Sequence, residues 1–366
     1  MANDKPASFE ERRRGSISTP QEKKKYLVRT ERCGDITVHV QGDISQQEKR
    51  AVFLTVHDLG CNHWAWEDFV NRPCMTEIKD RSIFIHIDVP GHEDNAEALQ
   101  ESQFPSLQTL GEDLVTVLDF IHVRYVIGLG EGAGANVLAR FALAHPSRTL
   151  GLILINCTGT VTSVKENFKA KFVNWKGKEG SVSQSAEDYL VFHKFGHMLS
   201  EQLMSESNPD KEKVMEEFLH RLRDSINTNN VKLFVNAFLN RSDLPLKQYK
   251  SDILLITGVL GSYANVVEKL YKDLDKNKAT LLKIERSGDV LSEAPAKVAH
   301  SILLFCKGQG LLTSITLPGI ERQRTFSGSS NEGDKPRRFS RGMSMEEYDK
   351  PNIRRLSITI GENAGK

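Results

Sequence analysis

Apolar residues fall into short continuous runs that alternate with segments of helical periodicity. The runs are AVFLTVH (51–57), SIFIHIDV (82–89), RYVIGLG (124–130) and LGLILIN (150–156). Such nearly unbroken runs are typical of strands that are buried on both faces. Residues 107–122, between the second and third runs, repeat apolar side chains at helical spacing. Residues 133–143, between the third and fourth runs, predict a small apolar helix. This alternation predicts βαβ units and a mostly parallel sheet.

The same pattern extends in both directions and is interrupted once. Residues 26–42 read as two strands joined by a hairpin at Cys33-Gly34-Asp35. The strand runs resume at SDILLITGVL (251–260) and ATLLKIE (279–285), with helices at 266–274 and 294–306. Between them, residues 160–247 lack strong strand runs and predict helices such as SAEDYLVFHKFGHMLSEQLM (185–204). An insertion of this length predicts a helical cap on one α/β core.

The two ends of the chain differ from the rest in composition. Residues 1–25 are polar and charged, and residues 311–366 contain eleven Ser or Thr and ten Lys or Arg against seven Asp or Glu. Segments of this kind bury too little apolar surface to fold alone. We therefore expect a disordered N-terminal arm at 1–25, one folded domain at 26–310 with its cap at about 160–247, and a disordered tail at 311–366.

Charge and cysteine content exclude several classes of protein. Lys and Arg total 49 against 48 Asp and Glu, which argues against a dedicated nucleic-acid binder. The five cysteines are widely spaced and form no CxxC pair, so neither a disulfide framework nor a zinc cage is expected. No run of about 18 apolar residues and no secretory signal is present, and a cytoplasmic protein is the expectation.

The glycine-rich turn after the third run resembles the nucleophile elbow of α/β hydrolases. In those enzymes a buried strand ends in G-x-S-x-G and turns sharply into a helix, which lifts the serine hydroxyl into the site. Here the frame is Gly130-Glu131-Gly132-Ala133-Gly134. Gly132 stands at the serine position and has no side chain, so it cannot be a nucleophile.

The other two triad positions also lack their usual residues. The acid normally follows the strand after the cap, but the turn 259–263 contains no carboxylate and has Gly261 near its centre. The histidine normally precedes the last helix, where Asp289 stands instead. His300 lies about three turns inside that helix and cannot take the same place. The fold pattern thus survives without the catalytic residues.

Three longer segments carry a resemblance to a known family. They are TVHDLGCNH (55–63), HIDVPGHEDNA (86–96) and GEGAGANVLARFALAHP (130–146). Together with the Arg- and Ser-rich tail they resemble the N-myc downstream-regulated (NDRG) family. That resemblance implies an α/β-hydrolase fold without hydrolytic activity, and roles in signalling, stress response, growth and differentiation. The chain departs from the family in its acid-strand turn, GVLGSYANVV, and it has no long decapeptide repeats in the tail.

Three other interpretations of the sequence are open but less favoured. Gly128 to Ala133 fits the dinucleotide-binding pattern G-x-G-x-x-A, yet the next strand ends in Asn156 without an acidic residue. A hydrolase with an unconventional nucleophile would use Cys61 or Ser262, with histidines 57 and 63 as candidate bases. A metal site is conceivable at four residues near one strand end: His86, Asp88, His92 and Asp94. A hydrogen-bonded loop is the favoured interpretation there, and no metal or cofactor is expected.

Serines preceded by arginine are concentrated in the two arms. Basophilic kinases of the AGC type recognise cations three and five residues before a hydroxyl. Five serines have Arg at −3, and Ser327 alone in the tail also has Arg at −5. The candidate phosphosites are Ser16, Ser327, Ser340, Ser344 and Ser357.

These features together predict a non-catalytic signalling or adaptor protein with phosphorylated arms. Each phosphate would add about −1.5 to −2 charge, so that three would reverse the sign of a tail of net +3. Expected partners are proteins, a basophilic kinase and, peripherally, an anionic membrane surface, but not nucleic acid. The alternative is a hydrolase with an unconventional nucleophile.

Overall fold

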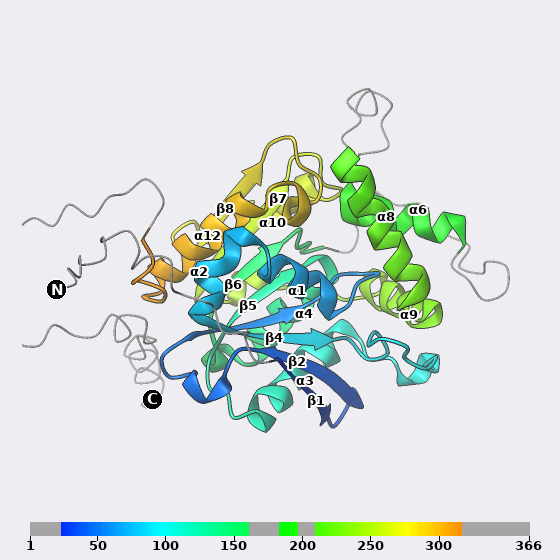
Figure 1. Ribbon diagram of the computed structural model, residues 1–366, viewed down its shortest axis with the longest axis horizontal. Coiled ribbons are helices and arrows are strands. Elements are labelled where there is room, and N and C mark those ends of the chain that lie inside the picture. Colours follow the sequence, from blue (N-terminus) through cyan, green and yellow to red (C-terminus); the bar gives the residue numbers. More distant parts are fainter. Residues whose placement is uncertain (1–22, 161–182, 197–208, 317–366) are drawn as a thin grey trace, which may run out of the picture.

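The computed structural model describes residues 23–160, 183–196 and 209–316, and its central feature is one twisted sheet (Figure 1). The order of the strands across the sheet is β1-β2-β4-β3-β5-β6-β7-β8. In chain order they are β1 Lys23–Arg29, β2 Asp35–Gln41, β3 Ala51–Val56, β4 Ser82–Asp88, β5 Val126–Glu131, β6 Thr149–Ile155, β7 Asp252–Gly258 and β8 Ala279–Ile284. Among these described strands, only the pairings of β2 with β1 and β4 are antiparallel. The mostly parallel sheet predicted from the apolar runs is confirmed.

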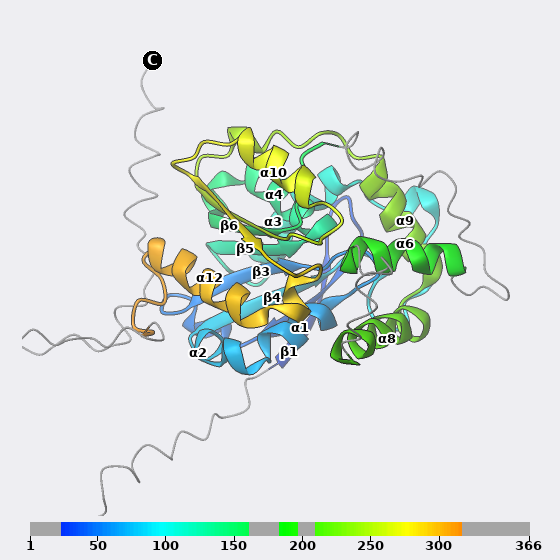
Figure 2. The ribbon, with the colours of Figure 1, turned by 90° about the horizontal axis from the view of Figure 1, so that it is seen from above.

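Helices cover both faces of the sheet (Figure 2). One face packs against α3 (Leu107–Phe120), α4 (Gly132–Ala144) and α10 (Ala264–Lys272). The other packs against α1 (His63–Val70), α2 (Thr76–Asp80), α11 (Val290–Glu293) and α12 (Pro295–Gly308). Short 3-10 turns lie at Ile44–Gln46, Pro73–Met75, Glu101–Gln103, Pro146–Arg148 and Leu246–Gln248. The two apolar cores lie between the sheet and these helical layers.

The insertion between β6 and β7 forms a helical cap at one end of the sheet (Figure 2). Its described helices are α6 (Gln184–Phe195), α8 (Pro209–Asp224) and α9 (Thr228–Leu239). Phe218 and Leu222 of α8 are buried in the core that the cap shares with the sheet. The predicted helix over 185–204 is wrong in its length, because α6 ends at Phe195 and is followed by Gly196, which has a positive φ of 75°. Residues 197–208 lie outside the described ranges.

The folded part of the chain is longer than the predicted 26–310. Strand β1 starts at Lys23, where it pairs with Gln41 of β2. After α12, Leu311, Leu312 and Ile315 are almost completely buried in the second core. In the described ranges, no helix has the length and apolar character needed to cross a membrane. Most of both predicted arms, 1–22 and 317–366, lies outside the described residues.

Candidate functional site

The turn from β5 into α4 has the geometry of a nucleophile elbow, with Gly132 at its tip. Gly132 has a φ of +52°, a left-handed conformation that side-chain-bearing residues rarely adopt. Two residues later, a Cβ on Gly134 would lie 2.2 Å from the carbonyl oxygen of Val56. Glycine at this position therefore lets α4 start directly against β3. The structure places Gly132 at the point where α/β hydrolases carry their serine.

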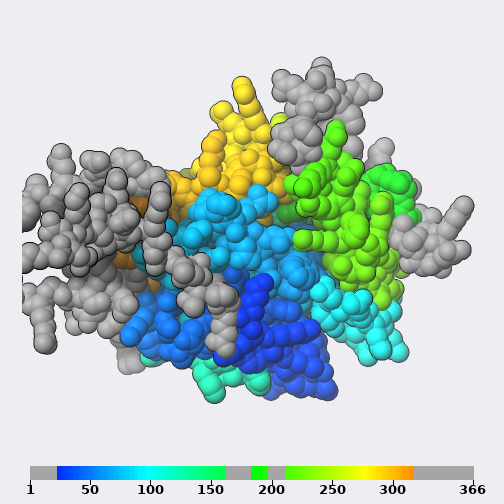
Figure 3. Space-filling view, in the orientation of Figure 1, coloured from blue at the N-terminus to red at the C-terminus, as the bar shows by residue number. Residues whose placement is uncertain are grey.

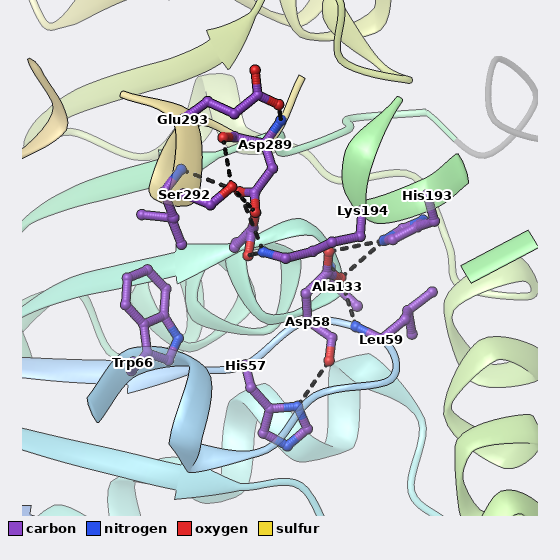
Figure 4. Close-up of polar contacts among 12 residues, drawn as sticks. His57, Asp58, Leu59, Trp66, Ala133, His193, Lys194, Asp289, Ser292 and Glu293 are labelled. Atoms are coloured by element: carbon purple, nitrogen blue, oxygen red, sulfur yellow. Dashed lines mark hydrogen bonds and ion pairs between the residues drawn. The ribbon is translucent and has the colours of Figure 1, made fainter. Parts of the chain in front are cut away.

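The carboxylate of Asp58 occupies the space beside this turn (Figure 4). Its Oδ1 atom accepts hydrogen bonds from the backbone N–H groups of Leu59 and Ala133, both at 2.8 Å. In active α/β hydrolases the corresponding two N–H groups, one after the nucleophile and one from the loop after β3, bind the oxyanion. A Cβ on Gly132 would lie only 2.1 Å from Asp58 Oδ1. A side chain of the loop itself thus fills both the oxyanion hole and the nucleophile's space.

His193, near the end of cap helix α6, holds Asp58 in this position. Its Nε2 atom lies 3.0 and 2.9 Å from the two carboxylate oxygens, and its Nδ1 atom lies 2.7 Å from the hydroxyl of Tyr263. Burial alone would raise the pKa of Asp58, but the charge and hydrogen bond of His193 lower it below its ordinary value. Asp58 is therefore a fixed anion. Sequence reasoning missed it, although the loop HDLG has Asp inside a motif that is glycine-rich in many hydrolases.

The next residue, Lys194, connects two other parts of the site (Figure 4). Its Nζ donates to Glu131 Oε2 at 2.6 Å and lies 3.5 Å from Asp289 Oδ1. All three side chains are buried. Burial raises the pKa of Glu131 to about 8, and the nearby carboxylates add to the rise although Lys194 opposes it. Burial would lower the pKa of Lys194, but the charges of Asp289 and Glu131 raise it well above its ordinary value.

The two remaining triad positions lie side by side in turns that hold α6. A Cβ on Gly261 would lie 3.5 Å from the carbonyl oxygen of Gly288, next to Asp289. Asp289 caps α11, since it accepts from the backbone N–H of Leu291 at 3.1 Å and from the hydroxyl of Ser292 at 2.8 Å. In the neighbouring turn, Ser262 donates its hydroxyl proton to the carbonyl oxygen of Phe192.

Glycines allow this close approach of α6. A Cβ on Gly288 would lie 2.0 Å from the carbonyl oxygen of Phe195, and one on Gly196 would lie 2.2 Å from that of Leu260. Both distances are far below an ordinary van der Waals contact. The end of α6 therefore lies directly against the two turns that contain Gly261 and Asp289.

The groups proposed for an unconventional nucleophile are not arranged as nucleophile and base. His57 donates from Nδ1 to the carbonyl of Asp58 and accepts at Nε2 from the backbone N–H of Val89, so both ring nitrogens are occupied. Burial raises the pKa of the Cys61 thiol to about 12. Within the described ranges, neither Cys61 nor Ser262 forms a hydrogen bond with a histidine ring.

The four residues considered for a metal site bind separate partners. His86 contacts Thr55, and His92 contacts the carbonyl oxygen of Pro90. Asp94 accepts from Asn62 and Trp64. Asp88 instead binds two histidines from other segments, His39 and His63. The five candidate phosphosites, Ser16, Ser327, Ser340, Ser344 and Ser357, all lie outside the described residues.

A pocket of about 130 Å³ opens beside the closed site. It lies between α1, α8 and the start of α11, and Lys194 and Asp289 form part of its wall. The rest of the wall is mainly apolar and includes Phe69, Val214 and Phe218. In the space-filling view, the green cap lies directly against the blue N-terminal part of the domain (Figure 3).

The sheet order, the elbow and the cap define an α/β-hydrolase fold. Similar solved structures include an esterase from Thermogutta terrifontis, with a TM-score of 0.58 and 14% identity over 78% of this chain and 98% of that one. A hydrolase from Pseudomonas aeruginosa has a TM-score of 0.57 and 18% identity over 77% and 97% of the two chains. At this level of identity the likeness concerns the fold alone.

The chain belongs to the Ndr family, whose model matches residues 26–313. It is 40% identical over 318 residues to an uncharacterized protein of Caenorhabditis elegans, covering 86% of this chain and 94% of the relative. It is 30% identical over 310 residues to the protein NDRG3 of Xenopus laevis, covering 80% and 78%. The protein NDRG2 of Pan troglodytes is 27% identical over 90% of both chains. The NDRG resemblance of the three sequence segments is confirmed.

Proposed function

We propose that this chain is a non-catalytic α/β-hydrolase-fold protein that acts by binding other proteins, as a signalling or adaptor molecule in growth, differentiation or stress responses. The observation that carries the proposal is the carboxylate of Asp58 in the oxyanion hole. An ester oxygen that gains negative charge needs the N–H groups of Leu59 and Ala133, and both already serve an anion. Membership of the Ndr family is consistent with this role.

Hydrolysis by another route is the second candidate, and the geometry gives it less support. A thiol with a pKa of about 12 remains protonated near neutral pH, and the thiolate is the nucleophilic form. The pocket beside Lys194 would still admit a small molecule, so a bound ligand is compatible with the proposed function.

A test of the catalytic question compares nitrophenyl ester turnover by the wild type, Gly132→Ser and Cys61→Ser. We expect all three to match a protein-free blank. In the wild type and in Cys61→Ser, Asp58 occupies the oxyanion hole, and in Gly132→Ser the new hydroxyl has Asp289 instead of a histidine base. Turnover by the wild type that Cys61→Ser abolishes would instead support the unconventional hydrolase. Substantial turnover by Gly132→Ser alone would contradict the assignment of Asp289 to the histidine position.

Regulation is proposed to lie in the two arms and to be electrostatic. Phosphorylation by an AGC-type kinase at Ser327 first, and also at the serines 16, 340, 344 and 357, would add negative charge to these arginine-containing arms. This change would release an acidic protein surface or an anionic membrane, or would recruit a reader of phosphoserine. The proposed setting is the cytoplasm.

Incubation of the full chain with such a kinase, followed by mass spectrometry, tests the regulatory proposal. We expect phosphate mainly on the serines of the two arms. The initial rate of phosphate incorporation should be lower in Ser327→Ala than in the wild type. Ser301→Ala, on α12, is the matched control and should leave the rate unchanged. Phosphate mainly on core serines would contradict the proposal. A pull-down with and without residues 317–366 then identifies partners that need the tail, and their binding should weaken with added salt.

A further inference from the structure

Two histidines and a glutamate from β2 and α1 meet on the face of the sheet that α1 covers. His39 lies on β2, His63 is the first residue of α1, and Glu67 follows one turn later. Each offers one ligand atom, and these three atoms lie within 4.8 Å of one another. The two imidazole rings are stacked, with 3.6 Å between their centroids. The side chains of His63 and Glu67 are almost buried, and that of His39 is 16% exposed.

A single buried carboxylate fixes how both imidazoles are oriented. Asp88 accepts from His39 Nε2 at 3.1 Å, from His63 Nδ1 at 2.9 Å and from the backbone N–H of His63 at 2.6 Å. Three nitrogens, one of them a backbone N–H, thus lie within hydrogen-bond distance of its two oxygens, and a carboxylate oxygen accepts hydrogen bonds.

Because each imidazole donates to Asp88 from one ring nitrogen, the other ring nitrogen of each histidine carries a lone pair. A neutral imidazole has one N–H and one lone pair, so donation to Asp88 leaves the lone pair on His39 Nδ1 and on His63 Nε2. In the part of the chain that the structure describes, neither of these two nitrogens has a hydrogen-bond partner. A carboxylate that holds the N–H side of an imidazole is the usual outer-shell partner of a metal-binding histidine.

We propose that His39, His63 and Glu67 bind a divalent transition-metal ion of the zinc type, with Asp88 as the carboxylate that orients both imidazoles. Two imidazoles and one carboxylate, with a further position open to water, form a ligand set that binds zinc in proteins. The ion would connect β2 to α1 and so fasten the N-terminal hairpin to the parallel part of the sheet. This site is independent of the proposed signalling function and of the Asp58 centre.

The ammonium group of Lys23 would compete with the metal ion for the carboxylate of Glu67. The Nζ of Lys23 lies 2.7 Å from Glu67 Oε2, and the side chain of Lys23 is 53% exposed. Zinc bonds of about 2.0–2.2 Å require the ligand atoms to be closer than they are in the metal-free arrangement. Glu67 must therefore turn from Lys23 toward the two histidines, and the two imidazole rings must tilt out of their parallel stack so that both in-plane lone pairs point at one ion. Because about half of the Lys23 side chain is exposed, its ammonium can move into solvent when the metal ion takes its place beside Glu67.

The sequence makes this site well suited to a direct binding measurement. Residues 1–22 and 317–366 contain no histidine and no cysteine, so the arms add no competing site of that kind. His220, which lies on the exposed face of α8 beside Asp224, provides a matched control. Gln at position 39 can still donate a hydrogen bond to Asp88, so His39→Gln removes the lone pair with little loss of support for the fold.

The experiment titrates the full-length, metal-stripped protein with Zn²⁺ against a chromophoric chelator, and with Co²⁺ followed by visible absorption. We expect one ion per chain in the wild type and in His220→Gln. His39→Gln and Glu67→Gln should each weaken binding by at least about tenfold, which is the lower end of the loss from an outer-shell partner. Lys23→Gln should tighten binding, because the carboxylate no longer has a competing cation. The Co²⁺ band should disappear in Glu67→Gln.

Circular dichroism of each variant separates loss of ligand from loss of fold. Binding that is absent in the wild type, or equal in the wild type and Glu67→Gln, would overturn the proposal. Weaker binding in Lys23→Gln would also contradict it, since that result would place Glu67 outside the ligand set. Loss of the ion in His220→Gln would place the site on α8 instead.

Discussion

Individual side chains determine what the geometry of this fold can do. The backbone N–H groups of Leu59 and Ala133 have the positions of an oxyanion hole, and the side chain of Asp58 alone gives them a permanent ligand. Hydrogen bonds to a charged group contribute about 1.5–3 kcal/mol each. The pair of N–H groups that lowers reaction barriers in hydrolases therefore stabilises the folded state of this protein. Gly132 is part of this arrangement, because a side chain there would displace the carboxylate.

The first prediction concerns Gly132→Ala. The new Cβ would lie 2.1 Å from Asp58 Oδ1, and the residue would keep a φ of +52°. Backbone strain of this type costs roughly 1–3 kcal/mol, and the clash adds to it, so we expect a loss of at least about 2 kcal/mol in urea unfolding. Gly308→Ala is the control, because its Cβ would meet nothing within 4 Å. Equal stability of the two variants would show that Asp58 moves away freely.

A second prediction at this scale concerns the pH dependence of stability. Glu131 has a folded pKa of about 8 because it is buried, against an ordinary value of 4.5. Between these values the folded state keeps a proton that the unfolded state releases, so stability falls as the pH rises, by up to about 1.4 kcal/mol per pH unit. Glu131→Gln has no carboxyl group at this position, so its stability lacks this contribution to the pH dependence. The melting temperature of the wild type relative to Glu131→Gln should therefore fall from pH 5 to pH 8.

The exposed Glu285→Gln provides the comparison for this measurement. Its melting temperature relative to the wild type should be nearly independent of pH over the same interval. A difference in melting temperature between the wild type and Glu131→Gln that stays constant from pH 5 to pH 8 would mean that Glu131 is ionised beside Lys194 throughout.

At the scale of elements, the end of α6 is what closes the site. Consecutive residues of a helix point about 100° apart. His193 therefore contacts Asp58 while Lys194 reaches Glu131 and Asp289. One turn of the cap thus connects the loop after β3, the end of β5 and the turn after β8. We infer that the cap is fastened to the sheet by buried charge as well as by its apolar side chains.

The third prediction is that Lys194→Met destabilises the fold strongly. Removing the ammonium leaves Asp289 buried without its cation, and breaking a buried pair in this way costs about 3–5 kcal/mol. Lys213→Met is the control, since Lys213 is exposed on α8 and lies 4.0 Å from Glu217. We expect that variant to stay within about 0.5 kcal/mol of the wild type in urea unfolding. Equal stabilities of the two variants would show that Lys194 is dispensable for closure.

The sequence predicted the sheet and the elbow because their signals are local. Strands buried on both faces give unbroken apolar runs, as in residues 51–57, and Gly132 stands in a recognisable five-residue frame. Contacts such as Asp58 to His193 join residues 135 positions apart, and no periodicity marks them. The end of α6 at Gly196 was missed for a related reason, since that helix stops where it meets Leu260. The stacked pair His39 and His63 likewise appears only when β2 and α1 are assembled.

At the scale of the whole molecule, one folded unit extends from β1 to the segment after α12. The Ndr family model covers almost the same part, residues 26–313. The amino-acid composition predicts that the tail starts at residue 311, because Ser and Arg accumulate from that region onward. The structure differs there, since Leu311, Leu312 and Ile315 fill the second core between α12 and the sheet. A few apolar residues beside a polar segment are too weak a pattern to mark this boundary.

The fourth prediction uses two truncations, one of which removes residues 317–366 and the other residues 311–366. The first should leave the melting temperature nearly unchanged, and limited proteolysis of the full chain should yield a stable fragment that ends near 316. The second also removes Leu311, Leu312 and Ile315, whose burial contributes about 2 kcal/mol each. We expect the melting temperature of this shorter chain to fall by roughly 10 °C or more.

Leu312→Ala in the full chain should lower the melting temperature by a smaller amount, which separates loss of core packing from loss of the tail. A large fall on removal of 317–366 alone would show that the tail itself packs on the domain, and equal melting temperatures for both truncations would contradict the structural boundary at 316.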